Sequence, residues 1–324
     1  MLNIPIPENL CYIISSEPLS LSKNLEFRAF NASQTSAPRL DLEIKNNSET
    51  AETLNIEVLS HPLVRISPRK TTLKIAPISR ETISFNVKLV RSNNRVRTPV
   101  EFKITTDSGV TFQTSWEDTF TMCVRAPGGF QLDGTWKNWK RAQALHADQK
   151  NQVVCIMPSA SWKGQSDLSA EILTMWDEKY FYLGCKVTDD VYSASQPIER
   201  AFLADSLEIG FANTTSGGII QFGAALHPQE GAQVYRHMPA PCELVRDAKI
   251  FVKPTGEAGN AEYQIAIPWS QINNVVPKAG QSLSFGIIVD DSDGKLNDRK
   301  FISWFGHGIH LRQMELLGKL NLVE

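Results

Sequence analysis

Acidic side chains occur beside short apolar runs in the second half of the sequence. Asp189-Asp190 and Asp290-Asp291 each follow such a run, and Glu208 lies within a third one. Two carboxyl groups at a set separation, one of them with a raised pKa, can hydrolyse a glycosidic bond. Acids at strand ends more commonly form turns or bind calcium, so these residues alone do not predict an active site.

The residues needed for other kinds of catalysis lack their usual arrangement. The sequence contains no Gly-x-Ser-x-Gly turn and no glycine-rich phosphate loop, and its six histidines occur in unrelated loops. The five cysteines are scattered and show no metal-ligand spacing. The sequence therefore predicts no catalytic residue.

A weaker signal for a metal lies at residues 290–294, which read Asp-Asp-Ser-Asp-Gly. Clustered carboxylates on a tight turn suit a calcium ion, so Asp290, Asp291 and Asp293 are candidate ligands. The segment lacks the downstream glutamate of an EF-hand, and a plain Asp-Gly turn is the alternative interpretation.

The acidic residues must be held by strands. Residues 180–187 alternate, with Phe181 and Leu183 among the residues on one face and Tyr182 on the other, which predicts a half-buried strand with a polar second face. Leu207, Ile209 and Phe211 repeat the alternation, so Glu208 is expected to face away from the core. The tryptophans at 176, 269 and 304 are expected to pack in or at the edge of that core.

Length and charge restrict the kinds of protein that this sequence can encode. A chain of 324 residues is long enough for two domains, each with its own core. The net charge of −2, with acids and bases interspersed, gives no electrostatic case for binding nucleic acid or an anionic membrane. There is no run of about 18 apolar residues and no basic-then-apolar signal at the N-terminus.

Two antiparallel β-sandwich domains are expected, so the predicted fold class is all-β. Residues 1–21 are interpreted as a leader or linker. Short alternating segments every 8–12 residues then predict an immunoglobulin-like sandwich at residues 22–126, a spacer or interaction module whose last strand is residues 119–124. A Pro/Gly cluster at residues 125–129 marks the boundary, and residues 127–324 form the second sandwich.

The second half resembles the family 9 carbohydrate-binding modules and their DOMON-like relatives. The motifs that carry this resemblance are Asp133-Gly134 with Trp136, Met175-Trp176-Asp177-Glu178, Val187-Thr188-Asp189-Asp190, Asp205-Ser206-Leu207-Glu208-Ile209, Ala266-Ile267-Pro268-Trp269, Ile302-Ser303-Trp304 and Leu317-Gly318-Lys319-Leu320. The resemblance implies a jelly-roll-type or DOMON-like sandwich.

The resemblance also implies where a sugar would bind. In the family, two tryptophans sandwich a terminal sugar, and Glu, Arg and Asn side chains bind its hydroxyls. The first tryptophan corresponds to Phe202, the glutamate is retained as Glu208, and the Arg and Asn positions fall on Gly223 and Ala225. The second tryptophan has no counterpart, and His310, Leu311 or Arg312 occupies that region. The expected ligand residues are Phe202, Glu208, Gln221 and Arg312.

The predicted function is therefore non-catalytic binding of a polysaccharide or oligosaccharide, in an altered site. The resemblance implies an extracellular or periplasmic location, a polysaccharide-acting catalytic domain as a partner in the same or another chain, and a role for calcium. One alternative is a structural or interaction module that keeps the fold and has lost the sugar site. Another is haem binding, with His237-Met238 and either His307 or His310 as ligands.

Overall fold

A computed structural model describes residues 25–30, 39–61, 64–89, 98–118, 121–194, 196–213, 217–256, 259–272, 275–295 and 297–324. The expected leader or linker at residues 1–21 lies outside these ranges. The chain divides into two compact units, residues 1–120 with 280–282, and residues 121–279 with 283–324. None of the described helices is long and apolar enough to cross a membrane.

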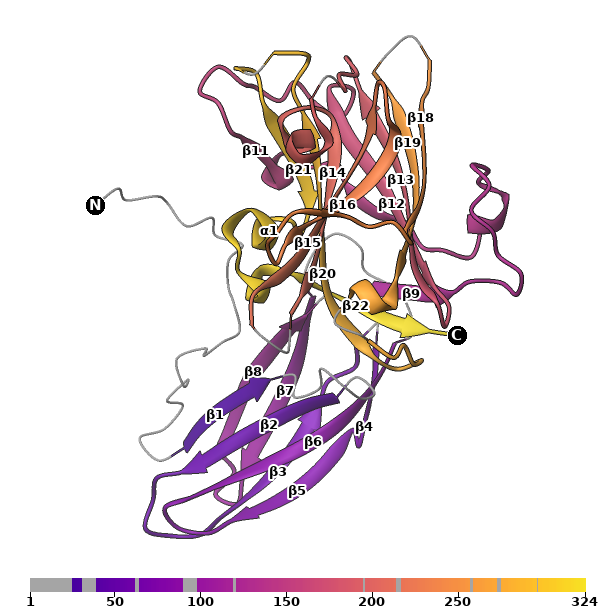
Figure 1. The fold of residues 1–324 in the computed structure, drawn as a ribbon. Coiled ribbons are helices and arrows are strands. Elements are labelled where there is room, and N and C mark those ends of the chain that lie inside the picture. Colours follow the sequence, from indigo (N-terminus) through magenta and orange to yellow (C-terminus); the bar gives the residue numbers. More distant parts are fainter. Residues whose placement is uncertain are drawn as a thin grey trace. The chain divides into compact units, whose positions relative to one another are not determined.

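The first unit contains two antiparallel four-stranded sheets (Figure 1). One has the order β1 (Leu25–Phe30), β2 (Arg39–Asn46), β6 (Ser79–Leu89) and β4 (Val64–Ser67), and the other has the order β5 (Lys70–Ile75), β3 (Glu52–Val58), β7 (Thr98–Thr106) and β8 (Thr111–Asp118). Phe85 of β6 packs on Phe102 of β7 with ring centroids 5.7 Å apart, so the core lies between the sheets. The unit is a β-sandwich, and its immunoglobulin-like character remains a prediction.

The second unit is built on one long, curled sheet. Its path is β17 (Glu243–Leu244), β16 (Gly231–Met238), β15 (Ile219–His227), β14 (Ser206–Ala212), β20 (Ser282–Asp291), β22 (Gly318–Val323), β9 (Thr121–Arg125), β12 (Leu168–Trp176), β13 (Tyr180–Asp189), β19 (Ala261–Pro268) and β18 (Lys249–Pro254). Three short strands pair at its sides: β10 (Leu145–Ala147), β11 (Val153–Cys155) and β21 (Lys300–Trp304).

The strand expected to end the first sandwich belongs to this second sheet. The prediction gave residues 119–124 to the first domain, whereas β9 pairs in parallel with β12 and β22 of the second unit. Its short alternating sequence is suited to either sandwich, and the choice depends on partners about 50 and 200 residues further along the chain. Residues 119 and 120 lie outside the described ranges, and the domain boundary itself remains a prediction.

Aromatic side chains join the two halves of the curled sheet into a sandwich. Phe181 of β13 lies 5.1 Å from Phe211 of β14 and 5.5 Å from Phe285 of β20, measured between ring centroids. These rings come from opposite halves of the path and are fully or almost fully buried. The alternation predicted for Phe181 and Phe211 is therefore confirmed, because both residues point into one shared core.

Two further expectations can be compared with this core. Trp176, Trp269 and Trp304 are all buried, as predicted. The second face of β13 is not the polar face that was expected, because Phe130 packs edge-on against Tyr182 with centroids 4.7 Å apart. The segment around residue 130 thus covers this face with a small apolar cluster of its own.

Removing one ring from the aromatic core should strongly destabilise the second unit. Phe285→Ala is expected to cost about 3–5 kcal/mol of unfolding free energy, through lost burial and the cavity left behind. Urea unfolding followed by tryptophan fluorescence measures this, since six of the seven tryptophans lie at residues 136–304. Phe251→Ala removes an equally large but 41 % exposed ring and should cost about 1 kcal/mol or less. Equal losses in the two variants would contradict the assignment of the core.

Candidate functional site

The outer face of β14, β15 and β16 carries the predicted sugar residues Glu208 and Gln221. In the register of β14 with β15, Glu208 lies opposite Gly223 and Gly210 opposite Gln221. Leu207 and Ile209 are fully buried on the inner side, so Glu208 faces away from the core as the alternation predicts.

A short helix covers part of this outer face. Helix α1 (His307–Leu311) packs Ile309 over Gly210, where an added Cβ atom would lie 2.5 Å from the Ile309 side chain. Ile309 belongs to an apolar cluster with Ile288 and Leu317. The helix thus makes the Gly210 end of the face apolar, and the polar side chain of Glu208 lies on the part that the helix leaves uncovered.

Glu208 is held by two hydrogen bonds. The Gln221 side-chain amide donates to Glu208 Oε2, and the Asp290 carboxyl is hydrogen-bonded to Glu208. Burial raises the pKa of both acids, and the neighbouring Glu208 charge raises that of Asp290 further. A hydrogen bond between two carboxyl groups requires a proton on one of them. Asp290 also accepts a hydrogen bond from Ser206 Oγ at 3.1 Å.

Phe202 lies beside this acid pair, in the 3-10 segment Ile198–Leu203. Its ring is 36 % exposed. The Arg299 guanidinium lies 6.0 Å from the Phe202 ring centroid, and its Nη2 donates to the Phe202 carbonyl oxygen at 2.9 Å. The charge of Arg299 also acts to lower the pKa of Glu208 and of Asp290, against the dominant effect of burial. Arg299 therefore contacts Phe202 and acts electrostatically on both acids.

His237 occupies the space above Gly223. The β15–β16 register passes from Gln221 opposite Met238 to Phe222 opposite Arg236, so His237 is the extra residue of a β-bulge. A bulge of this kind redirects a side chain, and a Cβ atom on Gly223 would lie only 2.3 Å from His237 Nε2. The imidazole meets Phe202 edge-on, with centroids 6.3 Å apart.

The environment of His237 favours the neutral imidazole. Burial lowers its pKa, and Nε2 is buried without a hydrogen-bond partner among the described residues. Nδ1 lies 3.5 Å from the sulfur of Cys242. Among the described residues, one ring nitrogen is therefore left without a partner, in the space over Gly223.

Sequence reasoning did not assign Arg299 or His237 to the sugar site. His237 was considered only as a haem ligand, and the polar ligand residues expected from the sequence were Glu208, Gln221 and Arg312. A histidine in a bulge and an arginine just before β21 carry no sequence signal that links them to Glu208. Only strand pairing brings them there.

Arg312 is not joined to the other predicted ligand residues. It ends α1 in a left-handed conformation, with φ of 57°, and is exposed. Among the residues that the structure describes, it has no hydrogen bond or ion pair with Phe202, Glu208 or Gln221. The other haem candidates, His307 and His310, pack against Phe301 with centroids 6.2 and 5.3 Å away.

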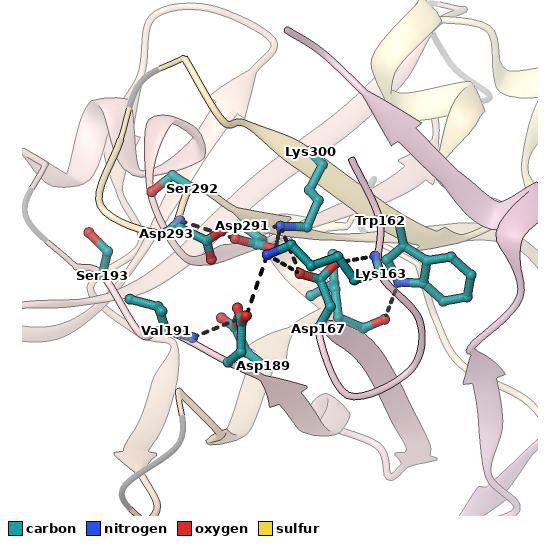
Figure 2. Close-up of polar contacts among 12 residues, drawn as sticks. Trp162, Lys163, Asp167, Asp189, Val191, Ser193, Asp291, Ser292, Asp293 and Lys300 are labelled. Carbon is teal, nitrogen blue, oxygen red and sulfur yellow. Dashed lines mark hydrogen bonds and ion pairs between the residues drawn. The ribbon is translucent and has the colours of Figure 1, made fainter. Parts of the chain in front are cut away.

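A second polar cluster lies at the strand ends (Figure 2). It contains the carboxyl groups of Asp167, Asp189, Asp190, Asp205, Asp291 and Asp293, together with the ammonium groups of Lys163 and Lys300. Asp291 and Asp293 are two of the predicted calcium ligands. The third, Asp290, points to the opposite face of β20 and binds Glu208 instead, because neighbouring residues in a strand alternate.

The buried members of this cluster have raised pKa values. Burial, followed by the charge of Asp205, raises the pKa of Asp189 to about 8. Burial likewise raises the pKa of Asp205 to about 7, although it accepts hydrogen bonds from the backbone N–H groups of Ser193 and Ser292. The side chains of Asp189 and Asp205 are hydrogen-bonded to each other, which requires a proton on one of them.

The cluster meets one requirement of a calcium site and fails another. The carboxylate oxygens of Asp189, Asp291 and Asp293 lie within 4.8 Å of one another, a spacing that suits a hard cation. However, the Lys300 ammonium lies 2.6 Å from Asp291 Oδ2 and 3.6 Å from Asp293 Oδ2. A positive group is thus already present among these oxygens, so the residues do not fit a divalent ion as they stand.

Comparison with known proteins agrees with the fold. Residues 132–324, more than half of the chain, match the family described as carbohydrate family 9 binding domain-like. The chain belongs to this family. The resemblance expected from the sequence motifs is therefore confirmed, and the family 9 domain is a carbohydrate-binding module, a class that is generally non-catalytic. A search of curated proteins found no match.

Several solved structures are similar to the family 9 domain. A family 9 carbohydrate-binding module from Caldicellulosiruptor kristjanssonii in complex with glucose is 16% identical, with a TM-score of 0.43, over 62% of this chain and 95% of that one. The complex with cellotriose gives the same identity and TM-score over 63% and 94% of the two chains. A candidate carbohydrate-binding protein from Bacteroides uniformis is 12% identical, with a TM-score of 0.44, over 62% and 97%.

The raised pKa of Asp189 should make the domain less stable as the pH rises. The folded protein keeps a proton that the unfolded chain releases near pH 3.8, so unfolding free energy falls between about pH 4 and pH 8. The slope contributed by one group is at most about 1.4 kcal/mol per pH unit. Urea unfolding from pH 5 to pH 8.5 measures it.

Asp189→Asn should remove this part of the slope. Asp133→Asn is a matched control, because Asp133 is exposed and hydrogen bonds from Thr135 lower its pKa. A stability that increases from pH 5 to pH 8 in the unmodified protein would contradict the proton sharing between Asp189 and Asp205.

Proposed function

We propose that the family 9 domain binds an uncharged terminal sugar ring of a polysaccharide or oligosaccharide at Phe202, Glu208, Gln221, His237 and Arg299. The observation that carries this proposal is the convergence of an exposed aromatic ring, a guanidinium and a carboxylate on the polar part of one sheet face. Sugar sites combine an aromatic surface for the ring with a few oriented polar groups for the hydroxyls.

The polar groups have complementary roles in this proposal. Glu208 is a hydrogen-bond acceptor whose orientation is fixed by Gln221 and Asp290. Arg299 is a donor held against Phe202 by its bond to the Phe202 carbonyl, and His237 supports the Phe202 ring edge-on. Arg299 supplies a polar group in place of those that Gly223 and Ala225 lack.

The charge balance supports a neutral ligand. With one proton between them, Glu208 and Asp290 would carry one negative charge, which the guanidinium of Arg299 would offset. His237 is neutral because burial lowers its pKa. A sugar with a carboxylate would add an uncompensated charge to this partly desolvated face.

The proposal extends to the setting of the domain. Family 9 modules are typically extracellular, which supports an extracellular or periplasmic place of action, with a polysaccharide-acting catalytic domain as the partner. The first sandwich would serve as a spacer or interaction module.

A second candidate function is an interaction module without sugar affinity. It is favoured by the fact that Glu208 already bonds Gln221 and Asp290 and that Arg299 lies over the Phe202 ring. If these groups are satisfied by one another, the face would position a partner protein instead.

Titration calorimetry with glucose and with cellotriose tests the sugar proposal. Phe202→Ala should weaken binding about tenfold or more, since a lost ring contact contributes about 1.4 kcal/mol. Phe251→Ala makes the same substitution at an exposed phenylalanine of β18 and should leave affinity unchanged. Absence of heat with every sugar, or binding that is indifferent to Phe202, would favour the interaction module.

Arg299 and Arg312 can be separated in the same assay. Arg299→Lys keeps the charge and removes the planar fork of donors, so it should weaken binding severalfold. Arg312→Ala tests the residue predicted from the sequence, and a loss equal to that of Arg299→Lys would show that α1 closes over the ligand.

A further inference from the structure

The acidic cluster at the strand ends has the composition of a cation site and already contains cations of its own. The cluster contains two sets of three carboxylates, and within each set the oxygens lie within 4.8 Å of one another. One set is Asp189, Asp291 and Asp293, and the other is Asp167, Asp190 and Asp293. Oxygen donors at this density suit calcium, which takes several carboxylates at once.

A lysine ammonium contacts the oxygens of each set. Lys300 Nζ lies 2.6 Å from Asp291 Oδ2, 3.6 Å from Asp293 Oδ2 and 3.5 Å from Asp167 Oδ1, and so touches both sets. Lys163 Nζ lies 3.6 Å from Asp167 Oδ1 and 3.7 Å from Asp190 Oδ2. Figure 2 shows the two lysine side chains converging among these carboxylates.

Lys300 is fixed in this position by the sheet. It is the first residue of β21 and lies opposite Asp291 in the antiparallel pairing of β20 with β21. Its side chain is 0% exposed, so it cannot move into solvent without opening the end of the strand pair. Lys163 differs, because its side chain is 62% exposed and only covers the outer side of the cluster.

The charge of Lys300 is stable in this environment. Burial alone would lower its pKa, but the hydrogen bond and charge of Asp291, with Asp167 and Asp293, outweigh burial and hold the pKa above its ordinary value. A buried ammonium persists only when it is paired in this way. The lysine is therefore a permanent cation at the centre of the cluster.

We propose that Lys300 is the resident cation of this cluster and takes the position that a divalent ion would otherwise occupy. The ammonium then holds together the loop that contains Asp167, the end of β20 at Asp291 and the following turn at Asp293. The proposed role of Lys300 replaces the calcium role implied by the resemblance to family 9 modules. The proposal does not depend on sugar binding.

The cluster also lies close in the chain to the proposed sugar site. Asp205 accepts hydrogen bonds from the backbone of Ser193 and Ser292 and directly precedes β14, which carries Glu208. An internal lysine would keep this end of β14 in place whatever the calcium concentration around the protein.

The first test uses the unmodified full chain. Its Tm is measured by calorimetry in EDTA and in millimolar calcium, and equilibrium dialysis measures bound calcium. The expected result is the same Tm in both solutions and no calcium bound at this domain. A Tm that rises with calcium, or tightly bound calcium at this cluster, would overturn the proposal.

The second test removes the ammonium. Lys300→Ala leaves the carboxylates uncompensated and is expected to lower Tm by roughly 10 °C in EDTA. Millimolar calcium should restore much of that loss, because a divalent ion can now enter. Lys186→Ala is the matched control, since Lys186 pairs with Glu171 at a 42% exposed position and its loss should create no calcium response.

The variant is informative even if it folds poorly. Recovery of folded protein only when calcium is supplied during refolding would support the proposal. A Lys300→Ala chain that is indifferent to calcium, whether folded or not, would show that the ammonium does not occupy a divalent position.

Discussion

The contact of Phe181 with Phe211 and Phe285 is the interaction on which the rest of the family 9 domain depends. These rings come from strands in opposite halves of one continuous sheet, and their burial closes that sheet into two layers. Once the inner faces are fixed, alternation fixes the outer ones. Glu208 and Asp290 must then lie outside the core, and Asp189 and Asp291 must lie at its end.

The candidate sugar site shows how such a scaffold can change its ligand groups without changing its strands. The sequence resemblance assigns the family's Arg and Asn positions on β15 to Gly223 and Ala225, and the space above Gly223 is filled by His237 from β16. Arg299, the residue before β21, lies 6.0 Å from the centroid of the Phe202 ring. The acceptor Glu208 remains at its position, while its neighbours come from other strands.

The acidic cluster is shaped by repulsion between carboxylates. At the end of a sandwich, several strands stop together and their turn-forming aspartates converge, so that repulsion between carboxylates must be relieved. In this chain the relief comes from a shared proton between Asp189 and Asp205 and from the buried ammonium of Lys300. A covalently attached cation is always present, whereas a bound ion depends on the concentration around the protein.

The sequence by itself determined the local pattern. Alternation of apolar residues was enough to predict an all-β chain of two sandwiches, the inward side of Phe181 and Phe211, the outward side of Glu208 and the burial of Trp176, Trp269 and Trp304. The ordered motifs were enough to indicate the family. These features depend on residues that are near one another in the chain, where periodicity carries the information.

Only the tertiary structure decided which side chains meet. The parallel pairing of β9 with β12 and β22, the bulge that turns His237 over Gly223, and the register that sets Lys300 opposite Asp291 all join segments far apart in sequence. A shift of one residue in any of these pairings would send the side chain to the other face. Local composition cannot specify that register, because it is fixed by packing across the sheets.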